Sequence, residues 1–296
     1  MHPVRASIDF LEQVLTKWSA DHCTTRGAAL AYFTLFSLAP IVMLTIAMVG
    51  LVLGSAAAQG EIFARIQATV GGEAAHTIEN LLANLASPAS GVAATAVSLA
   101  TMVIGASSAV AELQSSLNHI FEAPVAEGGA VRRVLRRRLA AVGLIVVIGV
   151  LLMASMLVDT VLNAAHRTMM GRFPIAAPVL TPLNFVMSLS VGIVLFSVVF
   201  RVLPDVTLRW HDALFGGAIT ATLFAVGKAL LALYLGRAGL TSAYGAAGSV
   251  VLLLLWIYYS ALIVLVGAEV TAVYARRREA AVATAASITV GNPDAR

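Results

Sequence analysis

Six long apolar segments constrain the fold of this chain more than any other feature of its sequence. A transmembrane helix needs about 20 predominantly apolar residues. An open strand edge cannot face lipid, so each segment is predicted to be an α-helix. We therefore expect an all-α, polytopic membrane bundle of six transmembrane helices, with residues 1–278 forming one integral membrane domain. The predicted spans are 29–54, 91–111, 139–163, 178–202, 213–236 and 243–274.

Basic residues cluster at every second boundary between these segments, whereas the other boundaries hold only scattered arginines. Positively charged residues concentrate on the cytoplasmic side of membrane proteins. An even number of spans then places both termini in the cytoplasm. The clusters are Arg5, Lys17 and Arg26; Arg132, Arg133, Arg136, Arg137 and Arg138; Arg201 and Arg209; and Arg276, Arg277 and Arg278.

The composition excludes an ordinary soluble domain. Only 11% of the residues are charged and 59% are hydrophobic, whereas a soluble domain carries about 25% charged residues. The net charge of +4 belongs to residues beside the apolar segments, which favours membrane lipids over nucleic acid as partners. The single cysteine, Cys23, excludes an internal disulfide and a cysteine-rich metal site.

Two regions outside the spans are predicted to be helical. In the segment Pro3–Arg26, apolar residues recur at helical spacing, which indicates an amphipathic helix. It either lies on the inner leaflet or packs on the bundle, and the sequence leaves both interpretations open. After the first span, two apolar-periodic stretches flank Gly71-Gly72 and predict a helical hairpin in the extracytoplasmic loop. The tail 279–296 is small and polar, which predicts disorder.

Five charged residues lie within or near the predicted spans and form the candidate polar site. Such residues are costly in a membrane unless they are paired or wet. Three of them fall near the cytoplasmic ends of their helices, and we expect Arg201 to lie between Glu112 and Glu269. Lys228 lies deeper, in the outer half of its span, and Asp159 is the nearest acid in depth. They either orient helices or bind a proton or substrate. The five are Glu112, Asp159, Arg201, Lys228 and Glu269.

Small residues and a proline add two further expectations. A small and polar face on the second span, from Gly91 to Ser115, either packs against neighbouring helices or lines a cavity. Small residues four apart, such as Gly105 and Ala109, permit close contacts within one chain or between two, so a homo-oligomer stays open. Pro40 lies inside the first span and is predicted to kink it.

Motifs of enzymes are absent from the sequence. No phosphate-binding loop, dinucleotide fingerprint, zinc-protease motif or nucleophile elbow occurs. Asp21-His22-Cys23 contains metal-ligand residue types, but adjacent residues on a helix point apart. We therefore expect no catalytic residues, no metal and no cofactor.

Four groups of residues carry a resemblance to a known family that covers roughly residues 5–278. They are Ala28-Ala29-Leu30-Ala31-Tyr32-Phe33 with Ser37-Leu38-Ala39-Pro40; Leu113-Gln114 with Leu117-Asn118 and Ile120-Phe121; Leu203-Pro204-Asp205 with Arg209-Trp210 and Gly216; and Tyr244-Gly245-Ala246, Leu254-Leu255-Trp256-Ile257-Tyr258 and Gly267-Ala268-Glu269. These stretches resemble the YihY/BrkB family of membrane proteins, once labelled ribonuclease BN. The resemblance implies six helices in a bacterial inner membrane and no established activity.

Two functions fit these expectations. The first is a transporter or facilitator that moves lipid, another amphiphile or a small solute across the inner membrane. The second is a structural or envelope-assembly membrane protein whose charges only hold helices together. A transporter should have a water-accessible cavity that reaches Lys228 or the level of Glu112 and Glu269, whereas a scaffold should bury these charges in paired, dry contacts.

Overall fold

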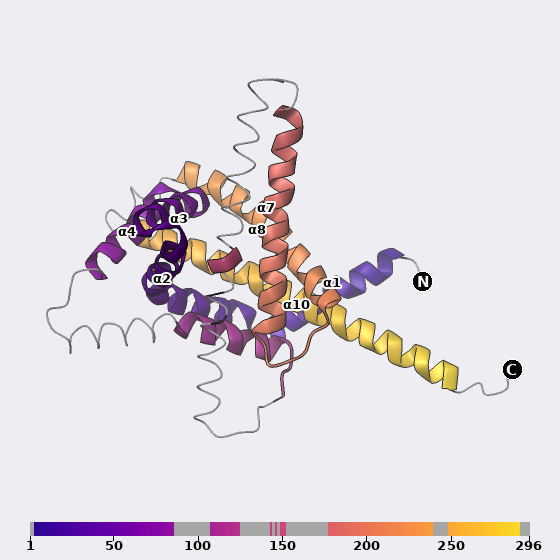
Figure 1. The fold of residues 1–296 in the computed structure, drawn as a ribbon. Helices are drawn as coiled ribbons and strands as arrows, with labels where there is room; N and C mark the ends of the chain where they lie inside the picture. The colour runs from indigo at the N-terminus through magenta and orange to yellow at the C-terminus, as the bar shows by residue number, and fades with distance from the viewer. Residues whose placement is uncertain are drawn as a thin grey trace.

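The computed structural model of the chain describes residues 3–85, 107–124, 143, 146, 149–151, 177–238 and 248–290. Apart from turns, these residues are helical, and no strand occurs among them. The prediction of an all-α membrane protein is confirmed. The helices are α1 (Pro3–Ala20), α2 (Cys23–Leu53), α3 (Ser55–Val70), α4 (Gly72–Leu85), α7 (Ala177–Val202), α8 (Trp210–Ala238) and α10 (Gly248–Val290), and residues 107–120 are also helical (Figure 1).

Three of these helices are long and apolar enough to cross a membrane, over Phe185–Val202, Trp210–Leu230 and Val250–Thr284. The bent α2 is a fourth if its two parts form one span. These helices cover the spans predicted at 29–54, 178–202, 213–236 and 243–274. The spans predicted at 91–111 and 139–163 lie mostly outside the described residues.

The first span bends close to Pro40. The axes of Cys23–Leu38 and Ile41–Leu51 differ by 52°. Proline lacks a backbone N–H and its ring clashes with the carbonyl one turn earlier, which is a common cause of a kink. One turn before the bend, the Ser37 hydroxyl donates to the carbonyl of Phe33 at 2.7 Å.

The helical hairpin predicted after the first span is present as α3 and α4. Gly71 separates the two helices with φ of 89°, a positive value that glycine adopts without strain. The hairpin covers α2 and α10 with its apolar side, where Ile78 and Leu82 are buried against Leu253 and Ile257. Amphipathic periodicity and a glycine break were therefore sufficient to predict this element.

Contacts between α8 and α10 are unusually close because each helix inserts a threonine into a glycine notch of the other. An added Cβ on Gly216 would lie 1.7 Å from Thr271 Oγ1, and one on Gly267 would lie 1.8 Å from Thr220 Oγ1. Each threonine hydroxyl donates to the glycine carbonyl four residues earlier on its own helix, at 2.7 Å for Thr220 and 2.6 Å for Thr271. The reciprocal order of these contacts makes the pair antiparallel. Small residues bring membrane helices together in this way because lipid offers no hydrophobic force between them.

The main core lies where the start of α2, the helical residues 107–120, the end of α7 and the middle of α10 meet. Cys23, Leu117, Phe200 and Leu265 are each fully buried there. Three of these elements also carry Glu112, Arg201 and Glu269 of the candidate site, so the core fixes the relative positions of these residues.

Two terminal helices differ from the sequence predictions. The segment predicted to be one helix over Pro3–Arg26 breaks after Ala20, and α2 already begins at Cys23. At the other end, α10 continues to Val290, so the predicted disorder is wrong for residues 279–290. This stretch is rich in alanine, the residue with the highest helix propensity, and extends an existing helix, which removes the cost of nucleation. It projects beyond the other helices (Figure 1).

The amphipathic helix α1 packs on α10 and also exposes apolar residues. Val14 is buried against Val270 and Val273 of α10. A neighbouring stripe of α1 stays exposed, including Leu11 at 59% and Leu15 at 66%. The helix therefore packs on the bundle, as one of the two interpretations has it, and retains an apolar face suited to a lipid surface.

Candidate functional site

Three consecutive arginines of α10 bind three different parts of the bundle. They are Arg276, Arg277 and Arg278, here called the arginine triplet. Consecutive residues of an α-helix point about 100° apart, so each arginine faces another neighbour. Arg277 Nε donates to Gln13 Oε1 of α1 at 2.9 Å. Arg278 Nη1 donates to Asp212 Oδ1 of α8 at 2.6 Å, and Asp212 is buried.

Arg276 completes the triplet by binding the last residue of the helix 107–120 and the turn that follows it. Its Nη1 donates to Glu122 Oε1 at 2.7 Å and its Nη2 to the carbonyl of Ile120 at 3.1 Å. Lys17 Nζ of α1 donates to the same Glu122 oxygen at 2.6 Å. The hydrogen bond from Lys17 and the charge of Arg276 hold the pKa of the Glu122 carboxyl below its usual range. Glu122 thus joins α1 to α10 as a carboxylate.

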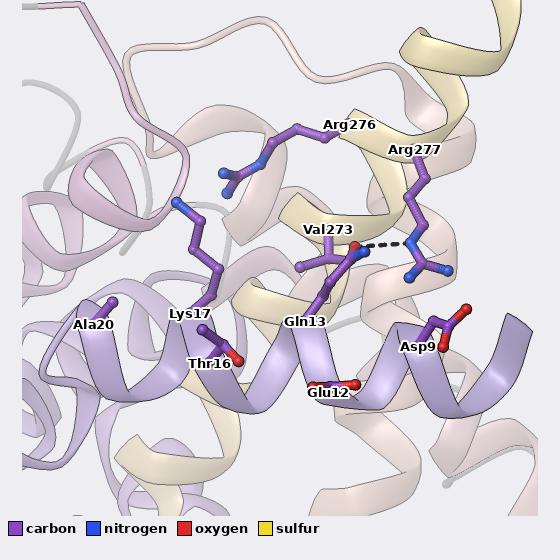
Figure 2. Close-up of a pocket in the computed structure, with 9 residues that line it drawn as sticks. All are labelled: Asp9, Glu12, Gln13, Thr16, Lys17, Ala20, Val273, Arg276 and Arg277. Atoms are coloured by element: carbon purple, nitrogen blue, oxygen red, sulfur yellow. Dashed lines mark hydrogen bonds between the residues drawn. The ribbon is translucent and has the colours of Figure 1, made fainter. Parts of the chain in front are cut away.

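A groove of about 680 Å³ runs between α1 and α10 next to these contacts. In Figure 2, α1 carries carboxylates along one wall and α10 carries arginines along the other, with the Arg277 guanidinium bonded to the amide of Gln13. The groove is open to solvent and combines both signs of charge. Its lining residues are Asp9, Glu12, Gln13, Thr16, Lys17, Ala20, Val273, Arg276 and Arg277.

A buried carboxyl group, Glu269, lies deeper in the same end of the bundle. Its side chain is fully buried, and Cys23 Sγ donates to its Oε1 at 3.3 Å. Its Oε2 has no hydrogen-bond partner among the described residues, and neither has Asp21 Oδ2. Asp21 lies close enough to interact electrostatically with Glu269. We call Asp21 and Glu269 the acid pair.

Sequence reasoning missed the acid pair because it treated Asp21, His22 and Cys23 as one continuous helix. In the structure, His22 adopts a left-handed conformation with φ of 50°, which separates α1 from α2. Residues on either side of this turn no longer obey helical geometry, so Asp21 and Cys23 both interact with Glu269. Within the described part of the chain, no three histidine, cysteine or acidic side chains are grouped as they would be to hold a metal ion.

The predicted ionic cluster of Arg201 between Glu112 and Glu269 does not form. The Arg201 guanidinium instead donates to the carbonyl of Leu208, and it lies 4.6 Å from the centre of the Trp210 ring. Leu208 lies in the turn between α7 and α8, and Trp210 is the first residue of α8. A backbone carbonyl and an indole face can also act as partners of a guanidinium, and sequence spacing does not reveal them. Glu112 is half-buried on the helix 107–120, and Asp159 lies outside the described residues.

Lys228 is exposed on α8, within the span Trp210–Leu230. It follows Ala221 by seven residues, about two helical turns, so the two residues share one face of α8. Ala221 is buried and its Cβ would lie 3.4 Å from a Cβ added to Gly192 of α7. Lys228 on the same face is exposed, whereas Ala221 is buried.

Comparison with known proteins gives matches over most of the chain. The family model described as Virulence factor BrkB matches residues 14–288. A UPF0761 membrane protein of Aeromonas salmonicida is 26% identical over 269 residues, which cover 89% of this chain and 88% of the relative. One of Nitrosospira multiformis is 26% identical over 267 residues, and one of Verminephrobacter eiseniae is 28% identical over 262. The chain covers 60% of each of these two relatives. No solved structure matches it.

Proposed function

We propose a function from one premise, which is that the chain belongs to the Virulence factor BrkB family and is a membrane protein. On that basis we propose that it moves lipid, another amphiphile or a small solute across the bacterial inner membrane, or facilitates this movement. The ligand's polar group would meet the exposed Lys228 of α8, and its apolar part would lie against the exposed apolar surface of the helices.

The exposure of Lys228 carries this proposal. A lysine that only holds helices together should be paired and buried, since a charge in a membrane is costly without a partner or water. Trp210 lies at the other end of the span and is 53% exposed, as an aromatic residue at a membrane boundary is. At 1.5 Å per residue, Lys228 is about 27 Å further along α8, close to the far boundary of a hydrocarbon core of about 30 Å. An ammonium group at that depth can reach an anionic headgroup.

The second candidate, a structural or assembly protein, is favoured by the arginine triplet. Each of these arginines joins α10 to another element, and none is free to carry a ligand without breaking such a contact. Two cavities lie at this end of the bundle, one lined in part by Val273 and the other by Ala275. Neither Lys228 nor Glu269 is among their lining residues.

Several further expectations belong to the same proposal. We propose cytoplasmic termini, because the arginine triplet and Arg26 then follow the bias of basic residues towards the cytoplasm. We also propose that the chain is not an enzyme and binds no nucleic acid, so purified protein should degrade no RNA. Membrane lipids are the proposed partners. Cross-linking in native membranes would distinguish a monomer from a homo-oligomer.

The transport proposal is tested by lipid and metabolite profiling of the inner and outer leaflets in a deletion strain. The strain is complemented with the wild-type chain or with Lys228→Ala, Lys228→Arg or Thr222→Ala. Lys228→Arg keeps the charge, and Thr222→Ala alters another exposed polar residue of α8. We expect at least one species to change its distribution on deletion, and Lys228→Ala alone to fail in restoring it. If Lys228→Ala rescues fully and no species is redistributed, the transport proposal is refuted and the structural or assembly role remains.

A further inference from the structure

The acid pair brings two carboxyl groups together in a place where two negative charges are hard to hold. Glu269 is fully buried, and the side chain of Asp21 is only 13% exposed. Taking an ionised carboxylate out of water is costly unless it is paired and hydrogen-bonded. Both groups nevertheless keep one buried oxygen without a hydrogen-bond partner among the described residues, Glu269 Oε2 and Asp21 Oδ2. A carboxyl oxygen that carries a proton needs no external donor.

The groups around Glu269 offset part, but not all, of the free-energy cost of burying an ionised carboxylate. On α10, Arg276 follows Glu269 by seven residues and interacts with it electrostatically, but its guanidinium is bonded to Glu122. On α2, the Cys23 thiol donates one hydrogen bond to Glu269. From α8, Asp212 is bound by Arg278, nine residues and so about 14 Å further along α10. Among the described residues, Glu269 thus has one weak hydrogen-bond donor, Cys23, and no cation bonded to it.

Asp21 has two basic neighbours, which touch its carbonyl and its other carboxyl oxygen. Arg26 Nε of α2 donates to the backbone carbonyl of Asp21 at 3.0 Å. His119 Nε2, at the end of the helix 107–120, lies 3.5 Å from Asp21 Oδ1. His119 is 47% exposed, so its imidazole reaches from solvent to the acid pair. These two neighbours can balance one negative charge on the acid pair and give a proton a route to it from solvent.

We propose that Asp21 and Glu269 hold one proton between them, so that this end of the bundle contains a proton-binding site. Two adjacent carboxyls in a poorly solvated site behave in this way because ionising the second places like charges in contact. The proton forms an O–H bond to one carboxyl oxygen and leaves one negative charge on the pair. It enters and leaves through water and the exposed imidazole of His119. This inference deepens the proposed function, since a proton site would couple solute movement to a proton gradient. Only this role of the site rests on the proposed function.

Loss of that proton has a structural consequence. With both carboxylates ionised, Asp21 and Glu269 repel each other across the contact between the α1–α2 turn and α10. The turn is held by a single residue in the left-handed conformation, His22, which is the point where α1 can swing away from α2. Cys23 follows directly and is fully buried against Glu269. Separation of the turn from α10 would therefore uncover the one thiol of the chain.

The rate at which a small neutral maleimide alkylates Cys23 measures this opening. The full chain, in vesicles of its native lipids, is labelled from about pH 5 to about pH 9, a range that starts just above the ordinary pKa of a carboxyl group and extends well beyond it. Each rate is divided by the rate for the same protein unfolded in detergent at that pH, which removes the ionisation of the thiol itself. We expect the normalised rate of the wild type to rise several-fold with pH. Glu269→Gln keeps an acceptor for Cys23 but cannot ionise, so its normalised rate should stay flat.

Three variants make the outcome decisive. Asp21→Asn should also flatten the profile, and it decides the question if Glu269→Gln fails to fold. Glu279→Gln removes an exposed acid of the same helix and should leave the rise intact. His119→Gln should also keep the rise. If the rise is lost in this variant, the titration belongs to the imidazole and the proposal is overturned. A wild-type profile without a rise, or a rise that persists in Asp21→Asn and Glu269→Gln, would overturn it too. The labelling assay does not depend on transport. If the labelling rate of Cys23 rises with pH as expected while the leaflet profiles stay unchanged on deletion, only the proposed function is refuted.

Discussion

Gly216→Ala is expected to destabilise the bundle strongly, because the added methyl group has no space between α8 and α10. Its Cβ would lie 1.7 Å from Thr271 Oγ1, 2.8 Å from Thr271 Cβ and 3.1 Å from Thr271 Cγ2. Real Cβ contacts stay above 3.0 Å. Rotation of the threonine side chain moves Oγ1 but not Cβ, and it breaks the hydroxyl's bond to the Gly267 carbonyl. The two helices must therefore move apart.

The cost should fall at the upper end of the range for overpacked cores, about 3 kcal/mol. This corresponds to a loss of more than about a hundredfold in the ratio of folded to unfolded protein. The measurement is reversible unfolding in mixed micelles of a mild detergent and sodium dodecyl sulfate. Gly60→Ala on α3 is the matched control, because a Cβ there meets nothing within 4 Å. It should be neutral or stabilising by up to about 1 kcal/mol, since alanine favours helix over glycine.

A double-mutant cycle tests whether the clash with Thr271 is the cause. Thr271→Ala removes Oγ1 and Cγ2 and leaves only the contact at 2.8 Å, which a small shift relieves. In the Gly216→Ala background it should therefore restore about 1–2 kcal/mol, within the usual range of coupling between touching residues. Equal stability of Gly216→Ala and Gly60→Ala, or additive effects in the cycle, would refute the reasoning from glycine notches.

Two other predictions follow from the same structure. Cysteines introduced at Gln59 and Arg136 in a Cys23→Ser background should react with a membrane-impermeant maleimide from opposite sides, and labelling of both from one side would contradict the predicted topology. Glu122→Gln should remove the acid sensitivity of α1 docking. A carboxyl with a lowered pKa contributes stability that is present above its ordinary pKa of 4.5 and is lost as the pH falls through its folded pKa. Protease cleavage of α1 should therefore increase in the wild type as the pH falls into the acidic range below this ordinary value, and a profile identical in both proteins would argue against the Lys17 and Arg276 contacts.

Hydropathy and periodicity predicted the fold because they are local properties of the chain. The apolar runs correspond to α2, α7, α8 and α10, and the glycine pair at 71–72 separates the hairpin helices as expected. The wrong prediction of disorder for residues 279–290 also came from a local property of the chain. Alanine-rich sequence after Arg278 was taken as small and polar, although it prolongs a helix that is already formed.

The candidate site was less predictable because its contacts are distant in sequence. Arg201 was expected to pair with carboxylates at a similar depth, but the nearer turn at Leu208 and Trp210 supplies its partners. Glu269 was identified as a buried charge, whereas its neighbour Cys23, 246 residues away, was not. Depth along a helix follows from counting residues, but the direction in which a side chain points across the bundle depends on how the helices pack.

The arginine triplet has a consequence for how α10 can move. Its three contacts point in three directions around the helix axis, towards α1, the end of the helix 107–120 and α8. Turning α10 by one residue, about 100°, would misalign all of them together, so rotation has to break three contacts in one event. For the same reason, inserting or deleting one residue just before Arg276 should be far more damaging than replacing any one arginine.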